Sequence, residues 1–129
     1  MKLRRLAHEY LVIAKPEAVI VGMAQGWDQA VGFAAMSLGI TVHAAVPFEG
    51  QENKWPPAAQ QEYRNLLLCC ATRTVVFPGG YCAYAMQLRN EWMVDRCNQL
   101  MAMWDGSPGG TANCIKYANK RGVPVVNLI

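Results

Sequence analysis

Short apolar runs alternate with segments of helical periodicity along this chain, and this alternation limits its fold more than any other feature. The apolar runs are rich in β-branched residues and too short for helices, which predicts strands at 18–22, 40–48, 74–77, 99–104 and 123–129. The segments between them predict helices at 2–14, 26–39, 58–71, 84–97 and 111–121. Such alternation is typical of a parallel sheet covered on both faces. We therefore expect a Rossmann-like three-layer α/β/α fold with a mostly parallel sheet of about five strands.

The length and composition indicate one globular domain, which we place at 1–129 because no linker, repeat or low-complexity segment interrupts the chain. Apolar residues make up 53% of the chain, which argues against disorder. The net charge of +3 comes from scattered residues, with no basic block, so we do not expect a nucleic-acid partner. No apolar run approaches the ~20 residues that span a membrane. The start lacks a signal-peptide cleavage site, so we expect a cytoplasmic protein without membrane contact.

The cysteines fit neither a disulfide framework nor a zinc site. There are five, an odd number, two are adjacent, and none are spaced as Cys-x-x-Cys. His8 and His43 are the only histidines, too few for a histidine-rich metal site. We expect reduced, mostly buried thiols, no metal and no cofactor.

Four loops follow the expected strands at their carboxyl ends, where open α/β sheets bind ligands. They read "GMAQGWD", "PFEGQENKW", "PGGYCAY" and "WDGSPGGTAN", and all are rich in glycine or polar residues. Because the carboxyl ends of parallel strands lie at one edge of the sheet, we expect the four loops to converge there. This convergence is more informative than any single loop.

The loop "DGSPGGTAN" has two interpretations. Gly109 and Gly110 let backbone N–H groups approach a ligand, Thr111 can cap the next helix, and that helix start attracts phosphate. A tight turn followed by a capped helix needs the same residue types. The loop is not a Walker A motif, because no Gly-Lys-Ser/Thr sequence follows.

Three further features also have two interpretations each. Gly22 and Gly26 lie between a strand and a helix, and Asp28 either stabilises the helix start or accepts a hydrogen bond from a ligand hydroxyl or amine. Arg89, near an apolar helix face, pairs with a carboxylate or contacts a phosphate. Trp55 is either a buried core residue, which is the simpler interpretation, or a plate for stacking on a base. We expect stacking, because a polar loop rarely keeps a tryptophan for core packing.

Four segments in this order resemble the SLOG superfamily: "GMAQGWDQA", "AAVPFEGQENKW", "MQLRNEWMVDRC" and "LMAMWDGSPGGTANCIKYA". Over about residues 15–129 the chain is most similar to the YpsA-like proteins of bacteria and phages. The resemblance implies a Rossmann-like fold that binds nucleotides or nucleotide-derived ligands. The superfamily includes DNA-processing DprA proteins and the LOG phosphoribohydrolases, which cleave the N-glycosidic bond of nucleoside monophosphates.

Two departures from the family pattern matter. "MQLRN" resembles the arginine motif of the LOG enzymes and gives that role to Arg89, but Cys114 stands where their catalytic glutamate would be. A thiol neither stabilises an oxocarbenium-like centre nor activates water well, which leaves Asp28, Glu49 and Asp105 as possible substitutes. YpsA-like chains also begin with a strand and a "TGHR"-like loop, whereas this chain starts in the helix. That strand would lie in the middle of the sheet and contribute to the ligand crevice.

We therefore expect a protein that binds a nucleotide or nucleotide-derived small ligand, with no catalytic residue assigned. The expected ligand-binding residues are Gly22, Gly26, Asp28, Glu49, Arg89, Asp105, Gly109, Gly110 and Thr111. The alternatives are a LOG-like phosphoribohydrolase and a non-catalytic protein-interaction module. The high apolar content and the absent strand lead us to expect a homo-oligomer.

Overall fold

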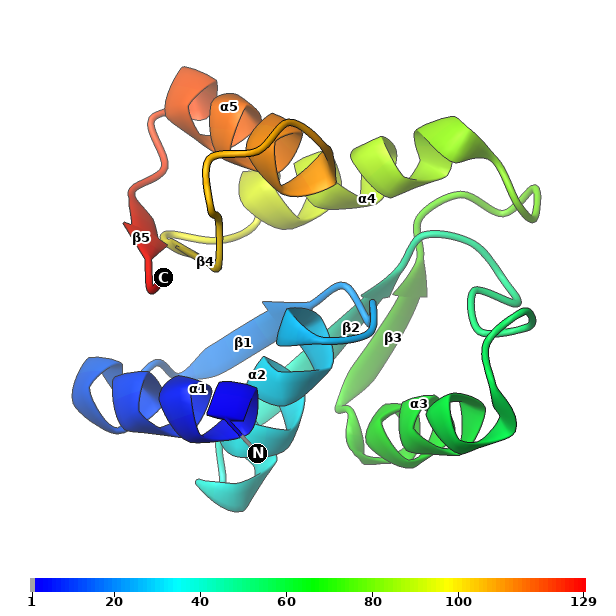
Figure 1. Cartoon of the computed structure of the whole chain (residues 1–129), viewed down its shortest axis with the longest axis horizontal. Coiled ribbons are helices and arrows are strands. Elements are labelled where there is room, and N and C mark those ends of the chain that lie inside the picture. The colour runs from blue at the N-terminus through cyan, green and yellow to red at the C-terminus, as the bar shows by residue number, and fades with distance from the viewer. Residues whose placement is uncertain (1) are drawn as a thin grey trace.

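Helices and strands alternate strictly along the chain in a computed structural model that describes residues 2–129. The helices are α1 (Lys2–Ala14), α2 (Trp27–Ser37), α3 (Pro57–Cys69), α4 (Ala83–Asp95) and α5 (Gly110–Arg121). The strands are β1 (Ala18–Val21), β2 (Thr41–Val46), β3 (Thr72–Val75), β4 (Leu100–Ala102) and β5 (Val125–Asn127). Each expected element is present, and the α/β fold class is confirmed (Figure 1).

The strands form two parallel sheets, which corrects the expectation of one sheet of about five strands. β2 lies between β1 and β3, pairing Val21 with Ala44 and Ala44 with Arg73, and β4 pairs separately with β5. No ladder joins β1 to β4 among the described residues. Both strands line the same cavity, so open space separates their facing edges and they lack the ~4.8 Å spacing of hydrogen-bonded strands.

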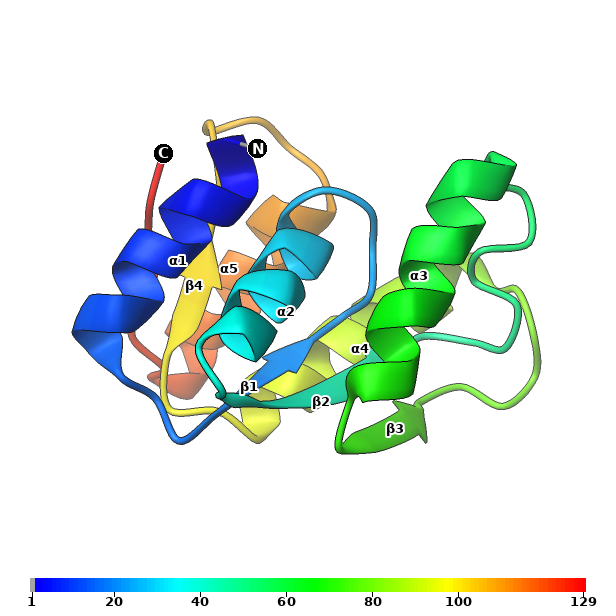
Figure 2. The same ribbon diagram turned by 90° about the horizontal axis from the view of Figure 1, so that it is seen from below.

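The two sheets belong to two halves of the molecule (Figure 1). The first half contains α1–α3 and β1–β3, and its core includes the fully buried Leu11, Tyr63 and Leu66. The second half contains α4, α5, β4 and β5, and its smaller core is built on Val94 and Ala118. α1 and α2 pack side by side on one face of the first sheet, and α4 lies on the opposite face (Figure 2).

Side chains join the two halves where backbone pairing does not. Trp27 Nε1 donates a hydrogen bond of 3.3 Å to the Met101 carbonyl, and Tyr10 donates one of 2.7 Å to Gln99. Arg89 of α4 reaches the end of β1, as described below. Within residues 2–129, no helix is long and apolar enough to cross a lipid bilayer.

Candidate functional site

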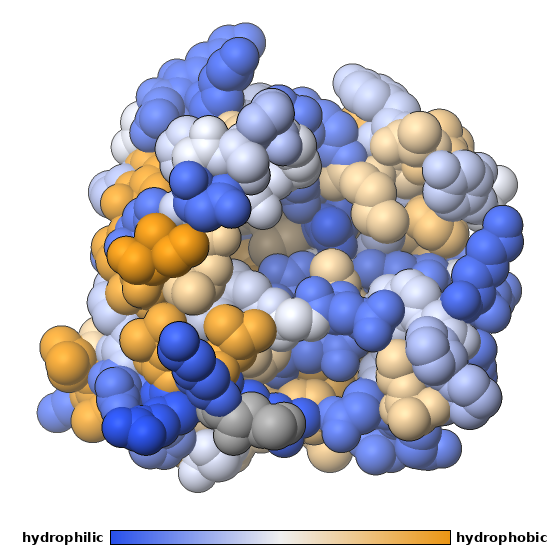
Figure 3. Space-filling view, in the orientation of Figure 1, coloured by the Kyte–Doolittle hydropathy of each residue, from blue (hydrophilic) through white to orange (hydrophobic). Residues whose placement is uncertain are grey.

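A cavity of about 560 Å³ lies between the two halves and brings together residues from three of the predicted loops or the helices that follow them. Figure 3 shows a hollow in the molecular surface near the centre of the view. All residues of β1 and β4 contribute to its lining. Of the predicted ligand-binding residues, the cavity is lined by Asp28, Arg89, Gly110 and Thr111.

The carbonyl oxygen of Gly22 lies just after β1, and polar side chains from other elements meet there. It accepts hydrogen bonds from Arg89 Nη1 and, at 3.3 Å, from Gln51 Nε2. A Cβ at position 22 would lie 2.7 Å from Arg89 Cζ and 2.8 Å from Asp28 Oδ2, so only glycine fits this approach. The sequence predicted Gly22, Asp28 and Arg89 at the site. It did not predict Gln51, because nothing in the sequence distinguishes this residue from the other polar residues of its loop.

Side-chain hydrogen bonds hold the loop after Gly22 in an uncommon conformation. Met23 is fully buried with a φ of 66°, a left-handed conformation that costs a residue with a side chain about 1 kcal/mol or more. Gln29 Nε2 donates to the Met23 carbonyl at 3.3 Å, and the Ala24 N–H donates to Asp28 Oδ2 at 3.2 Å. These bonds keep the Asp28 carboxylate in a fixed position at the cavity.

Asp28 and Arg89 are opposite charges in a partly dry environment. Burial raises the pKa of Asp28, although attraction to Arg89 and the Ala24 N–H oppose the shift. Burial likewise lowers the pKa of Arg89, which is only 5% exposed, and Asp28 opposes that shift. Within residues 2–129, Asp28 Oδ1 accepts no hydrogen bond, and Arg89 Nη2 has only Met86 Sδ at 3.9 Å. One oxygen and one amino group are therefore left to contact a ligand.

The start of α5 forms another part of the cavity wall. Gly109 is the N-cap residue, with a φ of 145° and no side-chain cap, so the prediction that Thr111 caps this helix is wrong. Thr111 lies inside the first turn instead. A Cβ at Gly110 would meet nothing within 4 Å, so there is free space beside this residue. The first N–H groups of a helix have no partner within the helix itself.

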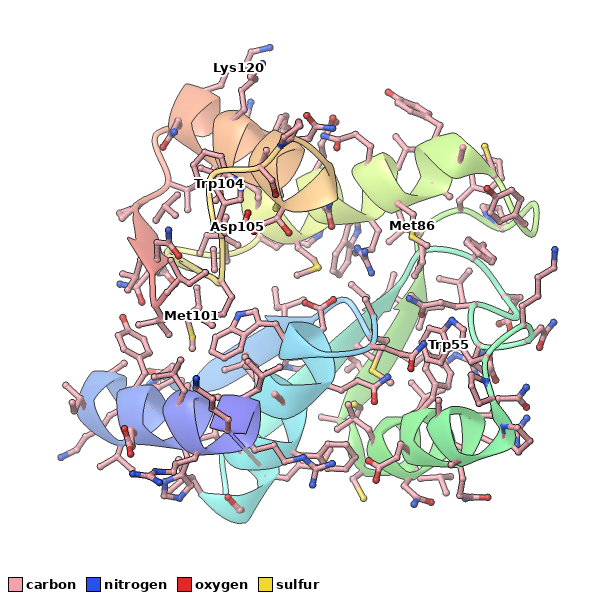
Figure 4. All side chains as sticks on the ribbon, viewed as in Figure 1. Trp55, Met86, Met101, Trp104, Asp105 and Lys120 are labelled. Carbon is pink, nitrogen blue, oxygen red and sulfur yellow. The ribbon has the colours of Figure 1, made fainter. Side chains whose placement is uncertain are left out.

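Other predicted residues lie outside the lining of this cavity. Glu49 is exposed and accepts two 2.8 Å hydrogen bonds from Arg73. Asp105 is exposed and accepts hydrogen bonds from Ser107 N and Oγ, which lower its pKa. Trp55 packs edge-on against Tyr63 with ring centres 5.5 Å apart, next to the larger core and on the α3 side of the molecule (Figure 4). Trp55 therefore packs against the core and does not line the cavity, contrary to the expectation that it stacks on a base.

Cys114 borders the cavity from the second turn of α5. Its thiol is buried, and burial raises its pKa to about 11, so it stays protonated at neutral pH and is a poor nucleophile. Across residues 2–129, no three His, Cys, Asp or Glu side chains gather in a way that could hold a metal ion. The arrangement offers hydrogen-bonding and charged groups for binding rather than an activated nucleophile.

The parallel strands and the alternating helices define a Rossmann-like α/β protein, and its cavity runs along the whole length of β1 and β4. The chain belongs to the family of the uncharacterized SPbeta prophage-derived protein YoqJ of Bacillus subtilis strain 168. The two are 30% identical over 135 residues, which cover 92% of this chain and 79% of YoqJ. A UPF0398 protein of Oceanobacillus iheyensis is 27% identical over 67 residues, covering 50% of this chain and 36% of that protein.

Among solved structures, DNA processing protein A (DprA) of Streptococcus pneumoniae shares the fold, with a TM-score of 0.76 at 17% identity. The match covers 96% of this chain and 44% of DprA, so the chain spans less than half of that protein. No protein-family model matches the chain. The likeness to DprA shows a shared fold, and the sequence relatives show the YoqJ family.

Proposed function

We propose that this protein binds a nucleotide or nucleotide-derived small ligand in the cavity between its two halves. The observation that carries the proposal is the convergence of Asp28, Arg89, Gly110 and Thr111 on one cavity of about 560 Å³. This volume falls within the range of ~300–1,000 Å³ that small-molecule sites commonly have. Asp28, Gly110 and Thr111 follow the carboxyl ends of β1 and β4, which is where such folds bind ligands.

The chemistry of the cavity matches the parts of a nucleotide. The open first turn of α5 and Arg89 Nη2 offer N–H groups and positive charge to a phosphate. Asp28 Oδ1 can accept hydrogen bonds from sugar hydroxyls. Apolar side chains such as Val31 and Ile115 line the same cavity and suit the faces of a base. Hydrolysis has less support, because the protonated Cys114 stands where the LOG enzymes have a glutamate.

Isothermal calorimetry with AMP, ADP-ribose and NAD tests the proposal. We expect at least one of them to bind and to raise the melting temperature. Gly110→Ala should weaken that binding about tenfold or more, because the added methyl group enters the open approach to the α5 N–H groups without clashing within the protein. Lys116→Ala, on the exposed side of the same helix, is the matched control and should bind normally. Absence of binding by the unmodified chain at millimolar ligand would show that the proposal is wrong.

A further inference from the structure

Asn90 follows Arg89 on α4, and both residues line the cavity between the two halves. Arg89 Nε donates a hydrogen bond of 2.8 Å to Asn90 Oδ1, and Arg89 Nη1 donates to the Gly22 carbonyl. Oxygen acceptors therefore hold two of the three nitrogens of the guanidinium. Among the described residues, the third nitrogen, Nη2, has only the weak acceptor Met86 Sδ at 3.9 Å. A ligand in the cavity can supply the oxygen that Nη2 lacks.

The bond from Arg89 Nε fixes the orientation of the Asn90 amide. A guanidinium nitrogen can only donate, so the amide oxygen has to face it and the amide nitrogen Nδ2 lies on the other side. Asn90 Nδ2 donates to no acceptor within residues 2–129. It is not sealed in the interior either, because Gln51 Oε1 is the only buried side-chain nitrogen or oxygen in this range without a partner. Asn90 thus has two free N–H groups on a side chain that lines the cavity.

The start of α5 lies close to this pair of side chains. Cys114 is four residues after Gly110, so both lie on one face of α5. Burial raises the pKa of Cys114 and the Arg89 charge opposes the shift, which places the thiol within electrostatic reach of the guanidinium. Gly110, Arg89 and Asn90 line the same cavity. The groups meet beyond the strand ends, because Arg89 reaches Gly22, just after β1, and Gly110 follows β4.

We propose that Asn90 Nδ2 and Arg89 Nη2 form a paired-donor subsite for an oxyanion, with Asn90 donating to one oxygen and Arg89 to a second. The inference rests on the proposed function, in which this oxyanion is the phosphate of the nucleotide or nucleotide-derived ligand. A phosphate has several acceptor oxygens, so it can receive both donors and an N–H group of α5 together. Asp28 offsets part of the Arg89 charge, which makes a further hydrogen-bond donor more important for holding an anion.

A purely positioning role for Asn90 makes a different prediction. Asn90→Asp keeps an oxygen for Arg89 Nε but removes both free N–H groups. If Asn90 only orients Arg89, this variant binds the anion as the parent chain does. If Nδ2 donates to the anion, affinity falls about tenfold or more, the scale of one hydrogen bond to a charged group. Asn98→Asp is the matched control, because it adds the same charge to the lining of the same cavity, before β4.

Inorganic phosphate is the probe, and NMR of the full chain is the readout. The side-chain amide signals of Asn90, assigned from its backbone, should move downfield as phosphate is raised through the millimolar range. The side-chain amide signals of Asn98 should stay in place. Backbone amide shifts of Gly110 and Thr111 measure the affinity of the parent and of both variants. The response of the parent chain does not depend on how well a variant folds.

Three results would overturn the proposal: Asn90 signals that do not respond to phosphate, unchanged affinity of Asn90→Asp, or an equal loss in Asn90→Asp and Asn98→Asp. Nucleotide binding is still decided separately, by the calorimetry with AMP, ADP-ribose and NAD. If the Asn90 signals respond to phosphate and Asn90→Asp alone loses affinity, the subsite is supported. If none of the three nucleotides binds in that case, the proposed function is wrong and the oxyanion belongs to another ligand.

Discussion

The Gly22 carbonyl shows how one backbone atom can organise a site. It receives Arg89 from α4 and Gln51 from the loop after β2, so groups distant in sequence meet at the end of β1. Arg89 is nearly fully buried, and this bond, with the nearby Asp28 charge, compensates for part of its lost hydration. The absence of a side chain at position 22 is what makes this approach possible.

Gly22→Ala should therefore destabilise the protein by about 2 kcal/mol, the scale of a buried hydrogen bond to a charged group. The new methyl group displaces the Arg89 guanidinium from the carbonyl and leaves a charge without its partner. Urea unfolding followed by circular dichroism measures the loss. Gly110→Ala is the control, since nothing lies within 4 Å of its methyl position. Equal stability of the two variants would contradict this account.

Asp28→Asn should make stability less dependent on pH. Because the folded pKa of Asp28 is raised, the folded chain holds its proton more tightly than the unfolded chain, whose value is about 3.9. Ionisation of Asp28 therefore lowers the free energy of unfolding as the pH rises from the unfolded pKa through the folded pKa. The asparagine keeps an oxygen for the Ala24 N–H and avoids this cost. Near pH 3 the variant and the parent chain should melt at nearly the same temperature. Towards neutral pH the melting temperature of the variant should rise relative to that of the parent chain. A constant difference across this range would exclude the mechanism.

At the scale of elements, the sequence was sufficient for the order and type of every helix and strand. The ends of these elements were harder to predict where hydrogen bonds to side chains or loops determine them. β4 ends at Ala102 rather than at 104, because the Trp104 N–H is bonded to the Asn127 side chain instead of a strand. β3 starts at Thr72, earlier than its apolar residues indicate, because the exposed Thr72 and Arg73 pair with β2.

The site was predictable to the extent that it follows strand ends. Asp28, Gly110 and Thr111 lie just beyond strands in the sequence, so topology alone brings them to one edge. The role of Gln51 and the gap between β1 and β4 depend on distances between elements, which no local pattern encodes.

The end of α5 gives a prediction at this scale. Gly122 closes the helix with a φ of 75°, a left-handed conformation that favours glycine. Gly122→Ala should cost about 1 kcal/mol, because the methyl group strains that conformation. Thermal unfolding compares it with Lys116→Ala, an exposed change within the same helix that should cost little. If Gly122→Ala loses no more stability than the control, the helix end is not held in this conformation.

The whole molecule consists of two halves whose hydrophobic cores differ in size. The core of the first half is much larger than the one that Val94 helps to form between α4 and α5. Since β1 and β4 share no ladder, we expect the second half to open while the first stays folded.

Val94→Ala should lower the stability of the second half by about 2 kcal/mol, from lost burial and the cavity left behind. Hydrogen exchange should accelerate in α4, α5, β4 and β5 and stay nearly unchanged in β2. Leu66→Ala, in the larger core, is the comparison and should accelerate exchange throughout the chain. Uniform acceleration by Val94→Ala would show that the molecule unfolds as one unit.

The division between the sheets also determines how the molecule would carry a mechanical load. Helix α1 lies in one half and strand β5 in the other, so tension applied between these two elements crosses the gap between β1 and β4 (Figure 1). At that boundary the load falls on side-chain contacts such as Trp27 with Met101 and Tyr10 with Gln99, because no strand ladder spans it. Such contacts give way one after another, whereas the bonds of a parallel ladder share a shearing force. A pulled molecule would therefore part at this seam first, with both sheets still intact.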